Sequence, residues 1–266
     1  MILAIFFLLL FAGIIRVVFF TKSLPFVLIY PYWSISVFSG KDPLSLRPHP
    51  AVSHPLLTAK EVTDIEASFV ADPFVFRQAD RWYLFFEALD RRTKKGVIAL
   101  AQSQDGLNWR YDLVVLAEPF HLSYPFVFEW QGQHYLIPEM GEMNSIQLYR
   151  AENFPYDWRF ERELLKGKPF NDTTLVHRDG RWWLFTAIHP YVDDTLELYF
   201  ASDLFGPWTA HPKNPIVAKD PDRARPAGRV IEMQGRLVRY AQKNRFYYGR
   251  DVSAREIVKL TTEEYE

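Results

Sequence analysis

The 266-residue chain contains no cysteine, which excludes disulfide bonds, thiol catalysis and cysteine-ligated zinc. The cellular compartment therefore cannot be inferred from cysteine usage. It also lacks a long basic run, and 31 Lys and Arg stand against 32 Asp and Glu, for a net charge of −1. We therefore expect no nucleic-acid partner. Little helical periodicity follows residue 60, and no dinucleotide-binding or phosphate-loop motif occurs. These absences disfavour helical and nucleotide-binding classes of protein.

Aromatic residues, in contrast, are abundant. They make up 17% of the chain, with 8 Trp, 14 Tyr and 22 Phe. Aromatic side chains favour β-strands, and they also form surfaces on which sugar rings stack. The excess therefore fits an all-β core, a glycan site, or both.

The N-terminus differs from the rest of the chain. Residues 1–20 are apolar except for Gly13 and Arg16, which is about the length that spans a bilayer as a helix. No basic residue follows Met1 directly and no small-residue cleavage site ends the run, so residues 1–20 predict a membrane anchor or uncleaved signal. The alternatives are a buried segment or a wrongly chosen start. Arg16 and Lys22 weakly favour a cytoplasmic C-terminal domain, and the side of the membrane stays open.

A repeat of about 50 residues runs through the rest of the chain. Four tight turns recur, and their equivalent residues lie 52, 48 and 55 positions apart: Arg81, Gln133, Arg181 and Arg236. Each turn separates two apolar β segments, as in a hairpin. A third apolar segment also recurs, and each copy is followed by a turn and a tryptophan. These tryptophans lie 49 and 50 positions apart, at Trp109, Trp158 and Trp208. Such a period is typical of β-propeller blades, and we interpret the tryptophans as blade packing.

The predicted fold class is therefore all-β, a five-bladed β-propeller. Its domain covers residues 33–266, and four blades are visible at about 72–120, 121–167, 168–220 and 221–266. A propeller must close so that no sheet edge stays open. We expect residues 33–60 to contribute to closure, and the completeness of the last blade stays open.

Carboxylates occupy matching positions in these blades. In an antiparallel hairpin, the start of the first strand and the end of the second lie at the same edge, which places Asp72 beside Glu87. The same offset places Glu139 and Asp172 at the equivalent ends of later blades. We expect these four carboxylates to converge on one mouth of the central channel. Further polar residues are predicted at the same rim as substrate-binding groups: His121, Tyr124, Asn144, His189, Arg225, Arg229 and Gln242.

Converging carboxylates suit sugar chemistry. One carboxylic acid can protonate a leaving oxygen while another carboxylate activates water or attacks the anomeric carbon. Crowding separates the pKa values of such groups, which assigns their roles. The structural alternative is that Asp72 only opens a turn before Pro73 and that a strand-ending Glu only pairs with an Arg of the next blade. We expect no cofactor; a carboxylate ring can hold Ca²⁺, although nothing in the spacing demands it.

The motifs ADPFVF and WYLFFE resemble the first blade of five-bladed propellers of the glycoside hydrolase family 43, 32 and 68 type. More closely, the segments HLSYPFVFEWQGQHYLIPE, NDTTLVHRDGRWWLFTA and ARPAGRV resemble the N-terminal propeller domain of plant glucosamine inositolphosphorylceramide transferase, which also occurs alone in many bacterial proteins. The likeness covers about residues 33–266.

The hydrolase resemblance implies roles for individual residues. Asp72 matches the catalytic base or nucleophile, and Asp172 matches the aspartate that orients substrate and tunes pKa values. The hydrolases place a general-acid Glu around the fourth blade, where this chain reads ARPAGRVIE and Glu232 lies within the strand. Glu139 or Glu87 would then supply the acid, by rim geometry.

Three functions compete at this stage. The first is a glycosidase-like enzyme in which Arg225 and Arg229 hold an anionic substituent such as a uronate or phosphate. The second is a non-catalytic module that binds a glycan or glycolipid and assists a partner glycosyltransferase at the membrane. The third is a scaffold in which the carboxylates pair with arginines between blades.

Overall fold

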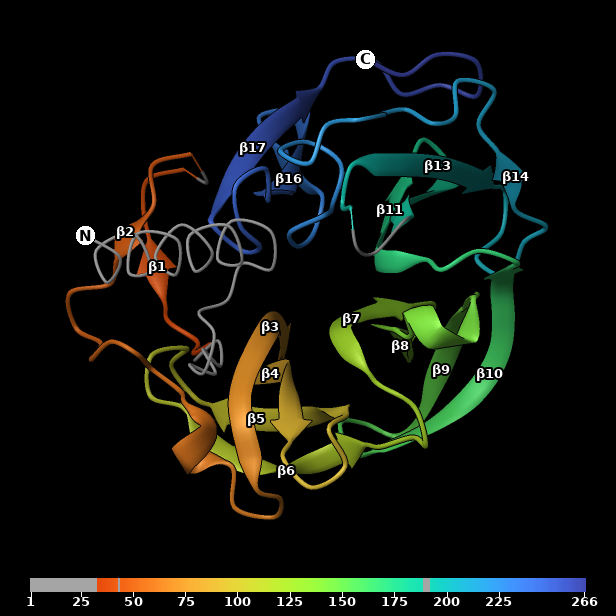
Figure 1. Ribbon diagram of the computed structural model, residues 1–266. Coiled ribbons are helices and arrows are strands. Elements are labelled where there is room, and N and C mark those ends of the chain that lie inside the picture. The colour runs from red at the N-terminus through yellow and green to blue at the C-terminus, as the bar shows by residue number, and fades with distance from the viewer. Residues whose placement is uncertain (1–32, 43, 189–191) are drawn as a thin grey trace, which may run out of the picture. The chain divides into compact units, whose positions relative to one another are not determined.

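The computed structural model describes residues 33–42, 44–188 and 192–266. Within these residues the chain forms four antiparallel sheets of three or four strands, arranged around a central axis (Figure 1). Strands follow one another in chain order in every sheet. The strands β3, β7 and β11 lie toward the centre, and β6, β10 and β14 lie at the perimeter. The predicted all-β propeller is confirmed.

The first three sheets contain four strands each and the fourth contains three. The first sheet comprises β3 (Ala67–Gln78), β4 (Arg81–Asp90), β5 (Gly96–Ser103) and β6 (Arg110–Leu116). The second comprises β7 (Ser123–Trp130), β8 (Gln133–Glu139), β9 (Ser145–Asn153) and β10 (Asp157–Lys166), with the 3₁₀ turn η2 (Gly141–Met143) after β8. The third comprises β11 (Asn171–Arg178), β12 (Arg181–Ile188), β13 (Thr195–Ala201) and β14 (Thr209–Ala210). The fourth comprises β15 (Ile231–Met233), β16 (Arg236–Lys243) and β17 (Asp251–Ile257).

The repeated turns form the hairpins that the sequence predicts. Two-residue turns with two left-handed residues match the twist of the strands that they join. Three of the four turns have this geometry, at Gln131–Gly132, Asp179–Gly180 and Gln234–Gly235. The turn signal is local in sequence, which is why these hairpins could be predicted.

The predicted count of five blades is wrong for the described residues. Residues 33–60 form only the two-residue strands β1 (Phe38–Ser39) and β2 (Arg47–Pro48), a bridge between Ile35 and Leu57, and the start of the 3₁₀ turn η1 (Ala59–Glu61). This stretch contains four prolines, which cannot donate to a strand ladder, so longer strands do not form.

The segment before β3 nevertheless contacts both the first and the fourth sheet. The Trp33 carbonyl accepts a hydrogen bond from the Val70 amide at 3.4 Å. The Trp33 ring meets the ring of Tyr248, in the loop before β17, edge to face at 6.2 Å. These are contacts that a closing segment would make, and closure through residues 33–60 stays a prediction.

The core lies between neighbouring sheets, where apolar side chains leave water. Buried side chains from adjacent sheets pack together, for example Phe85 with Leu136, Ile137 with Leu184, and Phe185 with Leu237. Trp158 is buried in one of these clusters, as the repeat predicts. The sheets are thereby held at positions that direct one end of each toward the channel.

The predicted membrane anchor, residues 1–20, lies outside the described residues. Among the residues that are described, no helix is long and apolar enough to cross a membrane.

Candidate functional site

A bulge recurs at the inner strand of the first three sheets. Asp72, Tyr124 and Asp172 occupy equivalent positions and share a left-handed backbone, with φ of 50°, 43° and 49°. The strand register shifts at each of these points. Residues with a side chain rarely adopt this conformation, and such strain clusters at functional sites. Because of the bulge, Glu87 pairs with Ala71 and not, as the hairpin offset predicted, with Asp72.

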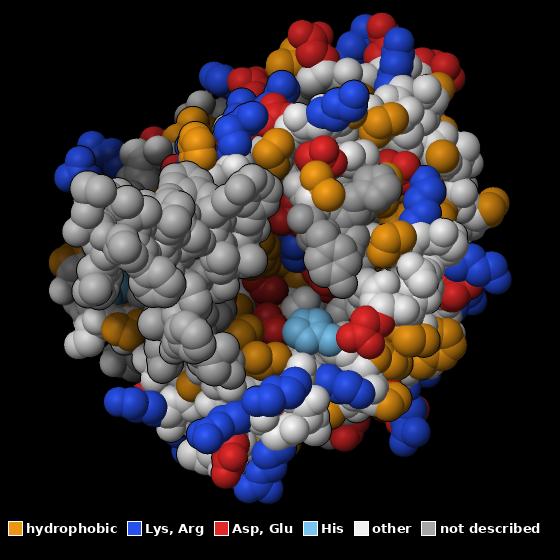
Figure 2. Space-filling model, in the orientation of Figure 1, with side chains coloured by type: hydrophobic (Ala, Val, Ile, Leu, Met, Phe, Trp, Pro, Cys, Tyr) orange, Lys and Arg blue, Asp and Glu red, His pale blue; other side chains and the backbone are white. Residues whose placement is uncertain are grey.

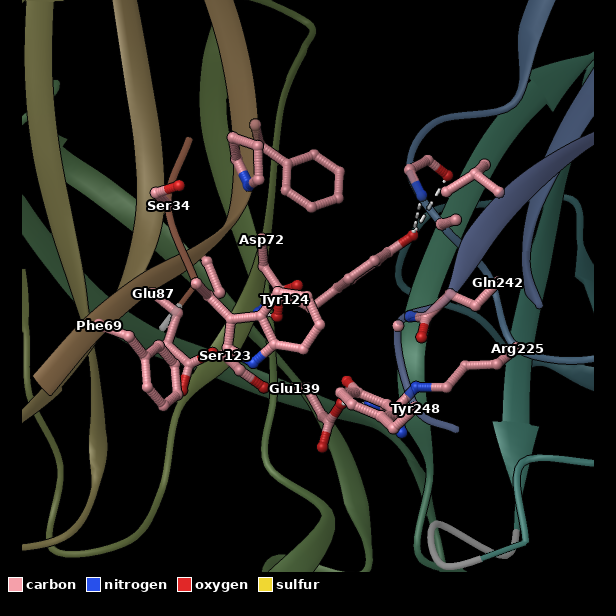
Figure 3. Close-up of a pocket in the computed structure, with 18 of the residues that line it drawn as sticks. Ser34, Phe69, Asp72, Glu87, Ser123, Tyr124, Glu139, Arg225, Gln242 and Tyr248 are labelled. Carbon is pink, nitrogen blue, oxygen red and sulfur yellow. Dashed lines mark hydrogen bonds and ion pairs between the residues drawn. The ribbon is translucent and has the colours of Figure 1, made fainter. Parts of the chain in front are cut away.

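A pocket of about 520 Å³ opens at the bulged end of the strands. Asp72, Glu87 and Glu139 line it, together with His121, Tyr124, Arg225 and Gln242. Figure 2 shows acidic side chains within the central opening, and Figure 3 shows Glu87 and Glu139 on the side facing Arg225 and Gln242. Seven of the residues predicted from the sequence therefore meet at one cavity.

Arg225 is the centre of the charged network. Its guanidinium donates to Asp172 Oδ2 at 2.5 Å, to Asp193 Oδ1 at 2.9 Å and to Glu139 Oε2 at 3.2 Å. Its side chain is 9% exposed, so these charge-assisted hydrogen bonds form in a medium of low polarity. Three protein carboxylates already accept hydrogen bonds from Arg225, and the expectation that it also holds an anionic substituent stays a prediction.

Asp172 lies behind the pocket wall. It is 1% exposed and also accepts a hydrogen bond from Gln242 Nε2 at 2.8 Å. Burial raises the pKa of Asp172 to about 8, although the positive charge of Arg225 acts in the opposite direction. Gln242 is thus a partner of Asp172, and its amide is engaged by the protein.

Glu87 and His121 face each other across the pocket rim. The Nδ1 atom of His121 accepts the Gly96 amide proton at 2.9 Å, which leaves Nε2, 3.4 Å from Glu87 Oε1, to carry the proton of the neutral ring. Burial lowers the pKa of His121. Burial also raises the pKa of Glu87 well above its ordinary value, and the charges of Asp72 and Glu139 raise it further. Glu87 is thereby suited to hold a proton at neutral pH.

Asp72 accepts the backbone amide of Tyr124 at 3.2 Å and otherwise faces the pocket. Burial, followed by the negative charge of Asp172, raises the pKa of Asp72 to about 7. The group therefore changes its charge near neutral pH, where a general base is most effective.

Gly96 makes the approach of Glu87 and His121 possible. A Cβ atom at residue 96 would lie 2.2 Å from the Leu122 carbonyl oxygen and 2.8 Å from Glu87 Oε1. We expect Gly96→Ala to lower the free energy of unfolding by about 1–3 kcal/mol, because backbone must shift to make room. Denaturant unfolding checks this. Gly141→Ala is the control, since its Cβ would meet nothing closer than 3.4 Å, and equal losses in both variants would contradict the close-approach argument.

Tyr124 joins the second sheet to the third and to the loop before β15. Its hydroxyl lies 2.9 Å from Thr174 Oγ1 and accepts the Gly228 amide at 2.7 Å. The ring lines the pocket while the hydroxyl is occupied by these partners. Sequence analysis predicted the position of Tyr124, and the structure adds that its hydroxyl links the sheets.

Three predicted rim residues are not found in the pocket. Arg229 is buried with its guanidinium over the rings of Phe74 and Phe126, at 5.5 and 4.8 Å, and it donates to the Val127 carbonyl. Asn144 is an exposed left-handed residue that ends η2. These two assignments are corrected: the Arg229 side chain turns into the apolar layer, and Asn144 serves a turn. His189 lies outside the described residues.

Several residues of the site were missed by sequence analysis. Asp193 binds Arg225 and accepts Asn244 Nδ2 at 3.3 Å, and Asn171 donates to Glu139 Oε1 at 2.7 Å. Tyr248 lines the pocket and stacks its ring on Arg225 at 5.1 Å. Asn171 directly precedes the predicted Asp172, which is the one local signal that could have identified it.

The described residues contain no group of three or more His, Asp or Glu side chains positioned to hold a metal ion. The guanidinium of Arg225 stands between the three carboxylates that would otherwise be the nearest to such a group. The geometry therefore gives the Ca²⁺ suggestion no support.

Fold and pocket together define a β-propeller of the kind found in glycoside hydrolases, with an acidic pocket at one end of its channel. Similar folds include the exo-β-1,3-galactanase of Phanerochaete chrysosporium (TM-score 0.66, 12% identity, 85% of this chain and 54% of that one). An exo-1,5-α-L-arabinanase from a bovine ruminal metagenomic library matches with TM-score 0.63 and 10% identity, over 88% of this chain and 90% of that one. At these identities the likeness concerns the fold alone.

Comparison of the amino-acid sequence identifies a more specific relationship than the fold does. The chain belongs to the family described as glucosamine inositolphosphorylceramide transferase 1, N-terminal, whose profile matches residues 31–266. It is 38% identical over 253 residues to glucosamine inositolphosphorylceramide transferase 1 of Oryza sativa subsp. japonica, which covers 88% of this chain and 34% of the relative. The relative of the same name from Arabidopsis thaliana is also 38% identical. The chain thus spans about a third of the length of the curated relatives that it matches.

Proposed function

We propose that the pocket is a carbohydrate-active site with glycosidase-like acid–base chemistry. The observation that carries the proposal is the convergence of Asp72, Glu87 and Glu139, from three different strands, on one pocket. Its volume, about 520 Å³, falls within the roughly 300–1,000 Å³ of small-molecule sites. The name of the chain's family and the similarity of its fold to glycoside hydrolase propellers support a sugar as the ligand.

The carboxyl groups differ in environment as acid–base catalysis requires. The pKa of Glu87 is raised by burial, so Glu87 is the proposed acid that protonates the leaving oxygen. The pKa of Asp72 is raised by burial to about 7, so Asp72 is the proposed base or nucleophile. Glu139, which accepts hydrogen bonds from Arg225 and Asn171, is the proposed neighbour that stabilises positive charge developing on the sugar ring. Asp172 is proposed to position Arg225.

A second candidate is a propeller that binds a glycan or glycolipid without cleaving it. One observation favours it: Arg225 stands in the fourth-blade region where the hydrolase resemblance expects an acid, and it neutralises Asp172 and Glu139. In this case the propeller would present its ligand to a partner glycosyltransferase, since the relatives that carry this family are transferases by name. Association with a membrane belongs to the same proposal.

Sugar release distinguishes the two candidates. The full chain is incubated with a panel of furanosides, pyranosides and uronides, beside Asp72→Asn and Glu87→Gln. Asp80→Asn is the matched control, because Asp80 lies at the far end of the β3–β4 hairpin. We expect release by the native chain and the control, and its loss in both site variants. Release that persists in both site variants would contradict the catalytic roles, and saturable sugar binding without release would favour the second candidate.

A further inference from the structure

Among the described residues, His121 is the one histidine that lines the pocket, and the start of β5 holds it in place. Its Nδ1 atom accepts the Gly96 amide proton at 2.9 Å, and the neighbouring Leu122 amide donates to the Gly96 carbonyl at 3.0 Å. A ring nitrogen that accepts a hydrogen bond carries no proton, so the neutral ring has its proton on Nε2. These two backbone contacts therefore fix both the position of His121 and the nitrogen that can donate.

The donating nitrogen faces one oxygen of Glu87. His121 Nε2 lies 3.4 Å from Glu87 Oε1, and this is the one ion-pair contact of Glu87 within the described part of the chain. Oε1 also lies against β5, because a Cβ atom at residue 96 would come within 2.8 Å of it. Glu87 lines the pocket (Figure 3), whereas Gly96 does not. With Oε1 on the β5 side, Oε2 is the oxygen left to meet a ligand.

The length of this contact suits a free enzyme. A separation of 3.4 Å is longer than the roughly 2.7–3.2 Å of an N–H···O hydrogen bond. Hydrogen bonds that serve catalysis are often long in the free enzyme and shorten when substrate binds. Glu87 is 5% exposed, and a donor acts more strongly on a carboxyl group that is shielded from water. His121 Nε2 is therefore positioned to orient Glu87.

Other charged groups act on the pair without donating to Glu87. Three negative groups and one positive group act on Glu87: Asp72, Glu139, Asp172 and Arg225. The donors of Arg225 are directed to other carboxylates. Glu142, in η2, is the charged group that acts on His121. Within the described residues, the donor that approaches Glu87 is thus His121.

We propose that His121 is a positioning residue for Glu87, whose Nε2–H group binds Oε1 and thereby places the acid proton on Oε2, toward the substrate. This inference rests on the proposed function, in which Glu87 is the acid, and it gives His121 a role other than the substrate binding expected from sequence. The Oε2 proton passes to the leaving oxygen as the glycosidic bond breaks, and the electrons of that bond stay on the leaving oxygen. The resulting carboxylate keeps its hydrogen bond from His121, which retains its own proton.

Three substitutions of His121 separate its two contacts. Asparagine can accept the Gly96 amide proton but has no donor at the position of Nε2. Glutamine can place an N–H group at that position but has no acceptor at the position of Nδ1, and phenylalanine has neither. A merely structural role depends on the acceptor for Gly96, whereas the orientation of Glu87 depends on the donor.

The ionisation of Glu87 is measured first, by NMR of the full chain with isotope-labelled glutamate, and Glu87→Gln identifies the signal. We expect His121→Asn and His121→Phe to lower the acid dissociation constant of Glu87 about tenfold, because the lost donor favours the carboxylate, and His121→Gln to leave it within about threefold. Nitrogen NMR of the native chain is expected to find the proton on Nε2 of His121. A proton on Nδ1, or equal responses of Glu87 to the Asn and Gln variants, would overturn the inference. The native measurement stays decisive where a variant fails to fold.

Sugar release from the glycoside panel, followed across pH, separates this inference from the proposed function. We expect the alkaline limb of the release profile, which reports the acid, to move up by about one pH unit in His121→Asn and to stay in place in His121→Gln. Release by the native chain with the same alkaline limb in both variants would overturn the positioning role alone. No release by the native chain would overturn the proposed function, whereas the control of Glu87 by His121 stands or falls with the NMR result.

Discussion

Arg225→Met is expected to destabilise the propeller by about 3–5 kcal/mol, because it leaves buried carboxylates without their cation. Asp172, Asp193 and Glu139 all accept hydrogen bonds from this one guanidinium, and Asp172 is 1% exposed. Methionine has a similar length and can fill the space of the arginine stem, so the loss reports the charge more than the volume. Equilibrium unfolding in urea at pH 7.5 measures the change.

The same variant has a characteristic pH dependence. Burial raises the pKa values of Asp172 and Asp193, so these two groups can take up protons at lower pH, and the loss of stability should be smaller at pH 5 than at pH 7.5. Arg245→Met is the matched control: Arg245 pairs with Asp220 and Asp222, but its side chain is 50% exposed. We expect a far smaller effect there, since solvent screens exposed ion pairs. Similar losses in the two variants, or a loss independent of pH, would contradict the role given to Arg225.

Asp72→Asn is expected to stabilise the protein at pH 8 and to have little effect near pH 4.5. The pKa of Asp72 is raised by burial from 3.8 to about 7, so the folded state holds a proton that the unfolded chain has released. A raised carboxyl pKa contributes stability that is fully present below the unfolded value and is lost as pH rises through the folded value. The window of the effect is therefore about pH 4 to 7.

The size of the effect follows from the shift. About three pKa units correspond to at most about 4 kcal/mol, and the partial exposure of Asp72 to solvent reduces this figure. Asparagine mimics the protonated acid, so the difference in unfolding free energy between Asp72→Asn and the native chain should grow as pH rises. Thermal or urea unfolding across this range measures it, with Asp80→Asn as the control. A difference that stays constant with pH would show that Asp72 does not hold a proton in the folded state.

The repeat was readable from sequence because its signals are short-range. Turns such as Gln131–Gly132 and Asp179–Gly180 require left-handed residues, and the apolar runs beside them define hairpins wherever they occur. Strand ends follow from hairpin geometry, so the meeting of Asp72, Glu87 and Glu139 at one mouth could also be predicted. The absence of a fifth blade could not be predicted, because the apolar residues in 33–60 were interpreted as strands despite the prolines among them.

The partners of the site depend on contacts between sheets. Arg225 reaches Asp172 across 53 positions and Glu139 across 86, and no local pattern distinguishes it from an arginine that faces a ligand. Arg229, four residues further on, turns between Phe74 and Phe126 instead. The bulges at Asp72 and Asp172 are equally invisible, since they are left-handed residues other than glycine.

Sequence by itself determined the propeller and the acidic mouth of its channel, because strand period, turn chemistry and hairpin register act within a few residues. Only the tertiary structure decided how the charged groups at that mouth are paired. Where Arg225 lies among the carboxyl groups, and which of their oxygens accept hydrogen bonds, depends on how separate sheets pack and on how much water they exclude.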